Sequence, residues 1–409
     1  MTETFVIVGA SLTGGTAAVT LREEGFDGRV ILIGAEDHLP YERPPLSKQY
    51  LRGGMPAEKM LLRPAEFYAA NAIEMKLGIA AQRVEPGAKV VELVNGERVA
   101  YDKLLIATGG RNKRPPIPGI DLEGVYDLRV IGDADRIRAV ARPGKNVVVV
   151  GMGFIGSEVA ASLRGMGLNV TVIEGKDSPL GGLLGAEISG VLEAVHRENG
   201  VEMHFGEVVS AFEGVAHVER VTTRSGLALE CDFAVIGLGI QPQTDLVADT
   251  EVKLENGILV DEYCRTSVAD IFAAGDVANH LHPVLGHHIR VEHWQNAIRQ
   301  GAAAAKSMMG GGEPYQEIHW FWSDQYDVNL QYAGFHVEAD QVVIRGEPAG
   351  RRFVSFHLKD GALMAAVAIN RARDLTRSIP LIASGQRLDV AVLADETIDL
   401  RSLLGSPAK

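Results

Sequence analysis

The stretch Asn146-Val-Val-Val-Val-Gly-Met-Gly-Phe-Ile-Gly156 decides the fold of this 409-residue chain. Four consecutive valines are typical of a strand that is buried on both faces of a parallel sheet. Three glycines follow at the spacing G-x-G-x-x-G, and the alanine-rich segment after them predicts a helix to about residue 166. Residues 169–173 supply the next apolar strand. The segment therefore predicts a strand–turn–helix–strand unit of the kind that binds a dinucleotide.

The N-terminus repeats this pattern. A strand is expected at residues 5–8, a helix to about residue 24 and a second strand at residues 29–33, with Gly9-Ala-Ser-Leu-Thr-Gly14 as the turn. Ser11 replaces the second glycine, so it adds bulk where a pyrophosphate approaches, although its hydroxyl can donate to a phosphate. The alternative is a unit that has lost its nucleotide. We favour a functional unit because the rest of the motif is intact.

An acidic residue follows each glycine motif at the expected distance. Glu174 lies 23 residues after Gly151, and Glu36 lies 27 residues after Gly9. A carboxylate at this place binds the adenine-ribose hydroxyls and repels a 2′-phosphate. The second unit is therefore predicted to prefer NADH over NADPH, with Lys176 as a residue that could soften the preference.

Composition narrows the class of protein. The formal net charge of −13 disfavours nucleic acid and anionic membranes as partners. Cys231 and Cys264 form no C-x-x-C motif, which fits a reducing compartment. The first residues carry no basic segment of a signal peptide. We therefore expect a cytoplasmic enzyme with no membrane partner.

The last 95 or so residues have a different pattern. Apolar and polar residues alternate at 328–335 and at 353–358, and Asp360-Gly361 is a hairpin signal. A helix is expected from about 373 to 384. These features predict a small α+β domain with an antiparallel sheet.

Five further segments carry a family resemblance. They are His-Leu-Pro-Tyr-Glu-Arg-Pro-Pro-Leu-Ser-Lys at 38–48, Leu-Ile-Ala-Thr-Gly at 105–109, Thr-Ser-Val-Ala-Asp-Ile-Phe-Ala-Ala-Gly-Asp at 266–276, Val-Glu-His-Trp-Gln-Asn-Ala at 291–297 and Trp-Phe-Trp-Ser-Asp-Gln at 320–325. Together they resemble the FAD-dependent NADH:ferredoxin reductases, the family of putidaredoxin reductase and the biphenyl dioxygenase ferredoxin reductase. The resemblance covers essentially the whole chain.

The resemblance implies an α/β fold with two Rossmann-like dinucleotide-binding domains of glutathione-reductase type and a small C-terminal α+β domain. We expect an FAD-binding domain at 1–111 and 244–315, an NAD-binding domain at 112–243 and the C-terminal domain at 316–409.

The family pattern also implies the cofactor contacts. Thr13 would meet the FAD pyrophosphate, Glu36 the adenosine ribose and Asp276 the ribityl chain. The other implied FAD contacts are Gly9, Ser11, Gly14, Arg43, Lys48, the backbone of Ala81, Thr108, Gly109, Arg129 and the backbone of Trp294. The candidate NADH contacts are Gly151, Gly153, Ile155, Gly156, Glu174 and Gly239.

Three residues are candidates for catalytic roles. Lys48 would place a positive charge near the flavin N5 and stabilise the reduced ring, and Glu158 would pair with Lys48. The alternative for Glu158 is a solvated helix position. Trp322 would cover the flavin, whereas we interpret Trp320 as a core aromatic residue.

The predicted activity is electron transfer from NADH through FAD to a small iron–sulfur ferredoxin, [2Fe-2S] or of another cluster type. The ferredoxin would supply a cytochrome P450 or Rieske-type oxygenase, which the chain itself would not contact. The alternative is an FAD- and NADH-binding redox sensor or interaction protein of apoptosis-inducing-factor type.

Two other chemistries are disfavoured. Disulfide reduction needs a redox cysteine, and the segment 40–48 contains none. A metal site is not expected, because the group His280, His282, His287, His288 and His293 matches no standard ligand spacing.

Overall fold

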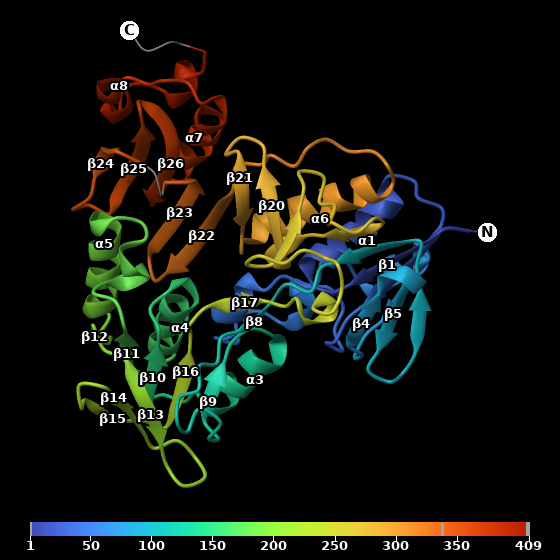
Figure 1. Cartoon of the computed structure of the whole chain (residues 1–409). Helices are drawn as coiled ribbons and strands as arrows, with labels where there is room; N and C mark the ends of the chain where they lie inside the picture. Colours follow the sequence, from blue (N-terminus) through green and yellow to red (C-terminus); the bar gives the residue numbers. More distant parts are fainter. Residues whose placement is uncertain (1, 337–338, 406–409) are drawn as a thin grey trace. The chain divides into compact units, whose positions relative to one another are not determined.

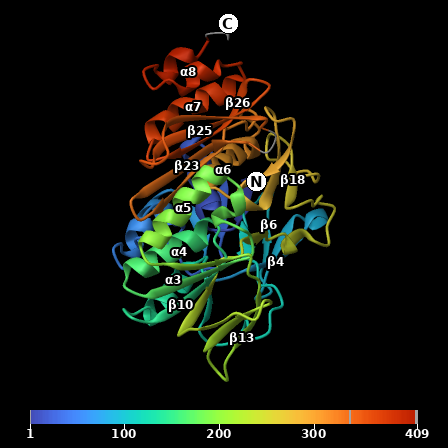
Figure 2. The ribbon, with the colours of Figure 1, turned by 90° about the vertical axis from the view of Figure 1, so that its left-hand side faces the viewer.

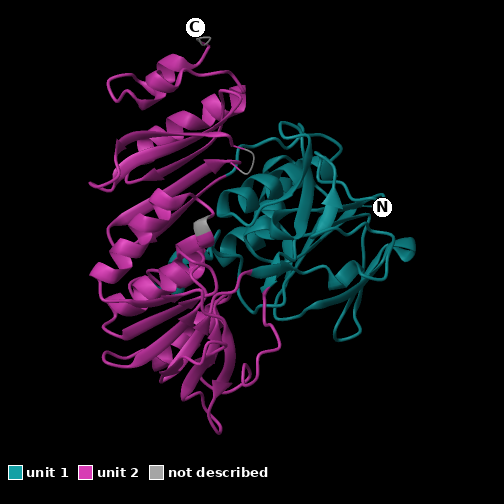
Figure 3. Ribbon diagram, turned by 60° about the vertical axis from the view of Figure 1, so that its left-hand side comes forward, with its two compact units in different colours: residues 1–43, 56–111, 240–319 teal, residues 44–55, 112–239, 320–409 magenta. Residues whose placement is uncertain are grey.

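The computed structural model describes residues 2–336 and 339–405. The chain forms two compact units, coloured separately in Figure 3. Unit 1 comprises residues 1–43, 56–111 and 240–319, and unit 2 comprises residues 44–55, 112–239 and 320–409. Within the described ranges, no helix combines the length and the apolar character needed to cross a bilayer.

Unit 1 is built on a parallel sheet of order β19-β7-β1-β2-β3 (Figure 1). Its strands are β1 (Thr4–Val8), β2 (Arg29–Ile33), β3 (Ile73–Lys76), β7 (Lys103–Ile106) and β19 (Ile271–Ala273). Their apolar side chains are almost completely buried, as the valine- and isoleucine-rich sequences predict. Helix α1 (Leu12–Glu23) follows β1 and packs against α6 (Trp294–Met308).

Two smaller antiparallel or mixed sheets complete unit 1. One contains β4 (Ala81–Glu85), β5 (Val90–Leu93) and β6 (Arg98–Ala100), and the other contains β18 (Ile258–Val260), β20 (Ala278–His282) and β21 (His287–Arg290). Unit 1 also contains α2 (Ala65–Ala70), the 3₁₀ helices η2 (Ala57–Met60), η3 (Pro86–Ala88), η5 (Asp245–Val247) and η6 (Gly275–Val277) and the short strand β17 (Ile240–Pro242), and the short strand β8 (Gly110–Asn112) begins in it.

Unit 2 contains the second parallel sheet, of order β12-β11-β10-β16-β9. Its strands are β9 (Val125–Asp127), β10 (Asn146–Val150), β11 (Asn169–Glu174), β12 (Glu202–Phe205) and β16 (Phe233–Ile236). Helices α3 (Ile131–Val140), α4 (Phe154–Gly165) and α5 (Ala186–Glu198) accompany it, together with the antiparallel strands β13 (Val209–Glu213), β14 (Arg220–Thr223) and β15 (Ala228–Glu230). The 3₁₀ helix η1 (Pro44–Ser47) packs on α3 and α4.

The C-terminal part of unit 2 is an antiparallel sheet of order β22-β23-β26-β25-β24. The strands are β22 (Trp320–Gln325), β23 (Val328–Gly334), β24 (Gln341–Glu347), β25 (Arg352–Lys359) and β26 (Ala362–Ile369). Helix α7 (Ala372–Ser384) packs on β23 and β26, and α8 (Val390–Ala394) follows (Figure 2). The predicted hairpin at Asp360-Gly361 is confirmed, since both residues adopt the positive φ that a type I′ turn requires.

The predicted fold class is confirmed: two five-stranded parallel sheets and a C-terminal antiparallel sheet with its helices organise the chain. Each of these three sheets lies within one of the three domains that the sequence predicts. The compact units group the chain differently, because residues 44–55 and 320–409 belong with residues 112–239. The three-domain division remains our proposal.

Candidate functional site

The first glycine loop cannot carry side chains at its two glycines. Gly9 has a φ of +114°, and a Cβ there would lie 2.1 Å from the carbonyl oxygen of Ala107. A Cβ at Gly14 would lie 1.9 Å from the carbonyl oxygen of Gly9. The loop therefore turns tightly from β1 into α1, where the N–H groups of the first helical turn can bind a phosphate.

Ser11 stands at the N-cap of α1, but its hydroxyl makes no capping hydrogen bond. Thr13, in the first turn, is buried and close to two other segments. A Cβ at Gly275 would lie 2.4 Å from Thr13 Oγ1, and one at Gly301 would lie 2.6 Å from the Thr13 carbonyl oxygen. The start of α1, η6 with Asp276, and α6 therefore converge at Thr13, as a common FAD site requires.

The second loop has the same tight geometry and also an open position. A Cβ at Gly156 would lie 2.0 Å from the carbonyl oxygen of Gly151, whereas a Cβ at Gly153 would meet no atom within 4 Å. Gly153 is the N-cap of α4 and has no side chain to cap it. The space at Gly153 and the uncapped helix end fit a pyrophosphate, so this loop suits NADH.

Both acidic residues lie near the end of the strand that follows their glycine loop. Glu174 ends β11 and accepts from the backbone N–H of Met152 at 2.6 Å, which fixes it beside the glycine loop. Glu36 accepts from Tyr41 Oη at 2.5 Å and from Arg43 at 2.9 Å. Arg43 thus contacts this side chain, consistent with its implied place along the cofactor.

The predicted pairing of Lys48 with Glu158 is confirmed. Lys48 Nζ lies 2.7 Å from Glu158 Oε2, and the side chains are only 8% and 4% exposed. Ser47 donates to the same carboxylate oxygen. Ser162, one turn further along α4, donates to the carbonyl oxygen of Ser47 at 2.6 Å. The segment 44–55 is therefore attached to α4, and Glu158 is not a solvated helix position.

The other oxygen of Glu158 reaches the C-terminal domain. Ser323 Oγ donates to Glu158 Oε1 at 2.7 Å, and Gln325 Nε2 donates to Ser323 Oγ at 3.1 Å. Gln325 Oε1 lies 2.9 Å from Nε2 of the buried His196 on α5. Burial lowers the pKa of His196, so its ring is neutral and donates to the amide oxygen. Sequence reasoning found Glu158 but missed these partners, although Ser323 and Gln325 lie in the quoted motif at 320–325.

The two tryptophans of β22 lie outside the core, which differs from the expectation that Trp320 is a core aromatic residue. Trp320 and Trp322 point to the same face of the strand, with ring centroids 5.6 Å apart, and both are partly exposed. The aromatic residue that packs on the core is Phe321, whose ring centroid lies 4.6 Å from Phe154 and 5.1 Å from Tyr332. The interpretation of Trp320 as a core residue was wrong, because strand alternation turns the residue between the tryptophans toward the core.

The other predicted cofactor residues lie at ends of elements. Ala81 starts β4 and Trp294 starts α6, while Thr108 and Gly109 follow β7. Thr108 Oγ1 donates to the carbonyl oxygen of Gln243 at 2.7 Å.

In unit 2, Arg129 precedes α3, and its backbone N–H donates to Asp133 at 2.8 Å. Ile155 is 47% exposed in the first turn of α4, and Gly239 follows β16 with a φ of +82°. An exposed apolar side chain beside the open position of Gly153 suits contact with a nucleotide.

The two cysteines are poor candidates for redox chemistry. Both are buried. Burial raises the pKa of the Cys231 thiol to about 12 and raises that of Cys264 as well. Both are therefore protonated near neutral pH and unreactive as nucleophiles.

Three histidines converge in unit 1. Ligand nitrogens of His280, His282 and His319 all lie within 4.8 Å of one another, and the three side chains are buried. His287 and His288 are instead exposed on β21, and His293 holds the N-cap position of α6. Sequence reasoning missed His319 because it lies 37 residues after His282 and belongs to no local pattern.

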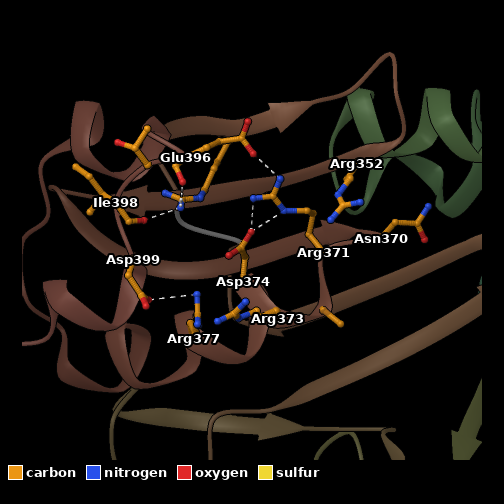
Figure 4. Close-up of a pocket in the computed structure, with 12 residues that line it drawn as sticks. Arg352, Asn370, Arg371, Arg373, Asp374, Arg377, Glu396, Ile398 and Asp399 are labelled. Carbon is orange, nitrogen blue, oxygen red and sulfur yellow. Dashed lines mark hydrogen bonds and ion pairs between the residues drawn. The ribbon is translucent and has the colours of Figure 1, made fainter.

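A pocket of about 390 Å³ in the C-terminal domain is lined by five arginines and three carboxylates (Figure 4). The buried Arg345 donates to the carbonyl oxygens of Asp395 and Ile398, both at 2.7 Å. Arg371 pairs with Asp374 and Glu396. These arginines attach residues 393–399 to the sheet, so we assign them a structural role.

Comparisons with known proteins identify the family of the chain. Residues 3–301 match the family model described as pyridine nucleotide-disulphide oxidoreductase, and residues 320–404 match the one described as reductase C-terminal. Rhodocoxin reductase of Rhodococcus erythropolis is 38% identical over 97% of this chain and 93% of its own length. The ferredoxin--NAD(+) reductase component of the anthranilate 1,2-dioxygenase system of Burkholderia cepacia is 38% identical over 98% of this chain and 99% of its own.

Two solved structures are similar throughout. The covalent putidaredoxin reductase–putidaredoxin complex matches with a TM-score of 0.96 and 30% identity, covering 99% of this chain and 98% of that one. The ferredoxin reductase for the CYP199A2 system from Rhodopseudomonas palustris matches with a TM-score of 0.94 and 35% identity, covering 98% and 99%. This chain therefore belongs to the pyridine nucleotide-disulphide oxidoreductase family, within its group of ferredoxin reductases.

Proposed function

We propose that the chain is an NADH-dependent, FAD-containing ferredoxin reductase of an oxygenase system. The observation that carries the proposal is the presence of two dinucleotide loops, in which Gly14 and Gly156 exclude a Cβ and Gly153 leaves open space. Relatives of nearly the same length that are named ferredoxin reductase components support it.

FAD is assigned to the loop at Gly9–Gly14. Thr13 and the uncapped N-terminus of α1 would hold its pyrophosphate, Glu36 its ribose and Asp276 its ribityl chain. Bound FAD supplies the conversion of a two-electron hydride donor into single electrons for an iron–sulfur acceptor.

NADH is assigned to the loop at Gly151–Gly156. The uncapped end of α4 would bind its pyrophosphate, and Glu174 would accept hydrogen bonds from its ribose and repel a 2′-phosphate. Ile155 and Gly239 would border the same nucleotide.

The buried pair of Lys48 and Glu158 would act on the flavin ring, where the hydride is transferred. Lys48 would hold a positive charge toward the flavin, where it stabilises the reduced ring. Glu158 keeps Lys48 oriented through the 2.7 Å contact, and Ser47 and Ser323 keep Glu158 oriented. Trp322 would place an aromatic face over the ring and exclude water.

The partner would be a small ferredoxin, and we propose a [2Fe-2S] cluster for it. A protein partner for the reductase is supported by the solved complex in which the relative putidaredoxin reductase is joined covalently to putidaredoxin. The oxygenase would receive electrons only from the ferredoxin. Because the donor is NADH and both thiols are free, we propose that the enzyme acts in the cytoplasm.

Anaerobic titration tests the proposal. The purified protein is expected to contain one FAD, to be bleached by one equivalent of NADH and to respond much less to NADPH. Addition of a [2Fe-2S] ferredoxin with cytochrome c should then give steady-state reduction. Flavin reduction without turnover on a panel of ferredoxins would instead support the redox-sensor alternative, and a colourless protein would exclude both.

A further inference from the structure

The three buried histidines of unit 1 form a compact triangle. The ring centroids of His280 and His282 are 5.6 Å apart, those of His280 and His319 are 5.6 Å apart, and those of His282 and His319 are 5.4 Å apart. His280 and His282 are two residues apart on β20 and therefore share one face of the strand. His319 comes from the residue just before β22. The exposed fractions of the three residues are 1%, 0% and 0%.

This triangle has the size of a metal-binding set. An imidazole nitrogen binds Zn²⁺ at about 2.0–2.1 Å, which puts each ring centre about 3.2 Å from the ion. Ring centres around one tetrahedral or trigonal ion are then separated by about 5.2–5.5 Å. The observed separations of 5.4–5.6 Å nearly match this range. The ligand nitrogens, within 4.8 Å of one another, need only a small inward shift.

Hydrogen bonding favours the same interpretation. His282 Nε2 lies 3.2 Å from the carbonyl oxygen of Glu317, so a neutral ring donates this N–H and carries its lone pair on Nδ1. Metal-binding histidines commonly donate their second nitrogen to a backbone carbonyl in this way. The ring of the buried His280 interacts with the backbone of Ile289, but neither ring nitrogen has a hydrogen bond of good geometry to a described residue. A metal would supply a partner for a nitrogen that burial removes from water.

The ligand type limits the ion. Three imidazoles without a carboxylate favour Zn²⁺, Cu²⁺, Ni²⁺ or Co²⁺ over Mg²⁺ and Ca²⁺, which prefer oxygen. Tyr315 packs against His280 with ring centroids 5.2 Å apart, but its hydroxyl donates to Asn296 at 2.8 Å. The fourth position is therefore left to a water molecule or another small ligand.

We propose that His280, His282 and His319 bind one divalent transition-metal ion, with Zn²⁺ as the representative. The ion would join β20 to the segment that leads into β22. Zn²⁺ has no redox chemistry, so the site would stabilise the fold and would take no part in electron transfer.

The test uses the FAD-loaded full-length protein. Cells are grown with added zinc, and the metal content of the purified protein is measured by mass spectrometry. Protein stripped with a chelator is then titrated with Zn²⁺ alone by calorimetry, and Co²⁺ replaces Zn²⁺ as a probe that absorbs beyond the oxidised flavin bands. We expect one ion per chain and a rise in melting temperature on binding.

Variants separate the site from adventitious binding. His319→Phe and His280→Phe should each weaken Zn²⁺ affinity at least tenfold. His287→Phe, an exposed histidine on the neighbouring strand β21, is the matched control and should bind as the wild type does. His319→Gln serves if the phenylalanine variant fails to fold. Wild-type protein with no stoichiometric ion by either loading route, or equal affinity in the His319 variants, would overturn the proposal. Flavin content and NADH reduction report separately on the proposed function.

Discussion

The Nζ atom of Lys48 and the Oε2 atom of Glu158 are 2.7 Å apart in an environment that excludes nearly all solvent. Two charges at such a position are stable only as a hydrogen-bonded pair, because each alone would be desolvated without compensation. The two residues lie 110 positions apart in the chain and come from the 44–55 segment and from α4.

Removing both partners of this pair should cost less stability than the two single removals added together. Lys48→Met or Glu158→Gln alone should lower the free energy of unfolding by about 3 kcal/mol, since each leaves a buried group without its partner. The double variant should lose less than the sum of the two. Calorimetric melts measure these losses, and anaerobic stopped-flow with NADH measures flavin reduction, which should slow in all three variants. Additive losses would show that the pair is not coupled.

Ser323 should act on the reaction through Glu158. Ser323→Ala removes the donor to Glu158 Oε1, and a hydrogen bond to a charged group contributes about 1.5–3 kcal/mol. We expect slower flavin reduction by NADH with little change in its KM. Ser157→Ala, next to Glu158 on α4, is the control, because among the described residues the Ser157 hydroxyl has one hydrogen bond, to the Met152 carbonyl oxygen at 3.4 Å, and none to Glu158. Equal effects in the two variants would contradict a specific role.

The second and third glycines of the NADH loop, Gly153 and Gly156, should respond differently to substitution by alanine. Gly153→Ala adds a methyl group where the protein has open space, so stability should change by less than about 1 kcal/mol while the KM for NADH rises. Gly156→Ala places a Cβ 2.0 Å from a carbonyl oxygen, so the melting temperature should fall markedly. FAD content should stay constant in Gly153→Ala. Unchanged NADH kinetics in that variant would remove the loop from the binding site.

Glu174 should control the choice of nicotinamide cofactor. Glu174→Ala removes the carboxylate that the Met152 N–H fixes beside the loop, so repulsion of a 2′-phosphate disappears. The ratio of kcat/KM for NADH to that for NADPH should fall at least tenfold. Lys176→Ala in the same background tests whether that lysine then assists NADPH. An unaltered ratio in Glu174→Ala would place the ribose elsewhere.

His357 in the C-terminal domain should make stability depend on pH. Burial and, to a smaller extent, the neighbouring His336 lower the pKa of His357 from 6.5 to about 4, although the Glu187 carboxylate acts in the other direction. Between pH 6.5 and 4, His357 is therefore protonated in the unfolded chain but largely neutral in the folded chain. Stability is full above pH 6.5 and falls as the pH drops toward 4, by about 2 kcal/mol at pH 5. His357→Gln should remove this part of the dependence in melts at pH 7.5 and 5, and parallel curves would contradict it.

Much of this architecture could be predicted because the deciding features are local. Gly14 and Gly156 are required by close approaches to the backbone a few residues earlier in the chain, and the strands before the two glycine loops are continuous apolar runs. The Lys48–Glu158 pair could be predicted only through the family resemblance. Nothing in the spacing of Ser47 or Ser323 shows that they bond to Glu158, because tertiary packing of three distant segments brings them together.

The histidine triangle also depends on a contact between residues that are distant in the sequence. His280 and His282 share a strand face, which alternation predicts, but His319 reaches them by the path of the chain between α6 and β22. At Trp320 and Phe321 sequence reasoning chose the wrong residue rather than missing one. Composition suggested aromatic core residues, but only strand register decided which one faces the core.

The hydrogen bond from Ser162 to the Ser47 carbonyl has a practical consequence for protein engineering. In the sequence, residues 44–55 lie within the part that is assigned to FAD, but in the folded chain they pack with the unit that contains the NADH loop. Chimaeras that exchange halves between homologous reductases should therefore transplant this dozen residues together with α4. A crossover that follows gene order alone would bring together a lysine and a glutamate from different parents.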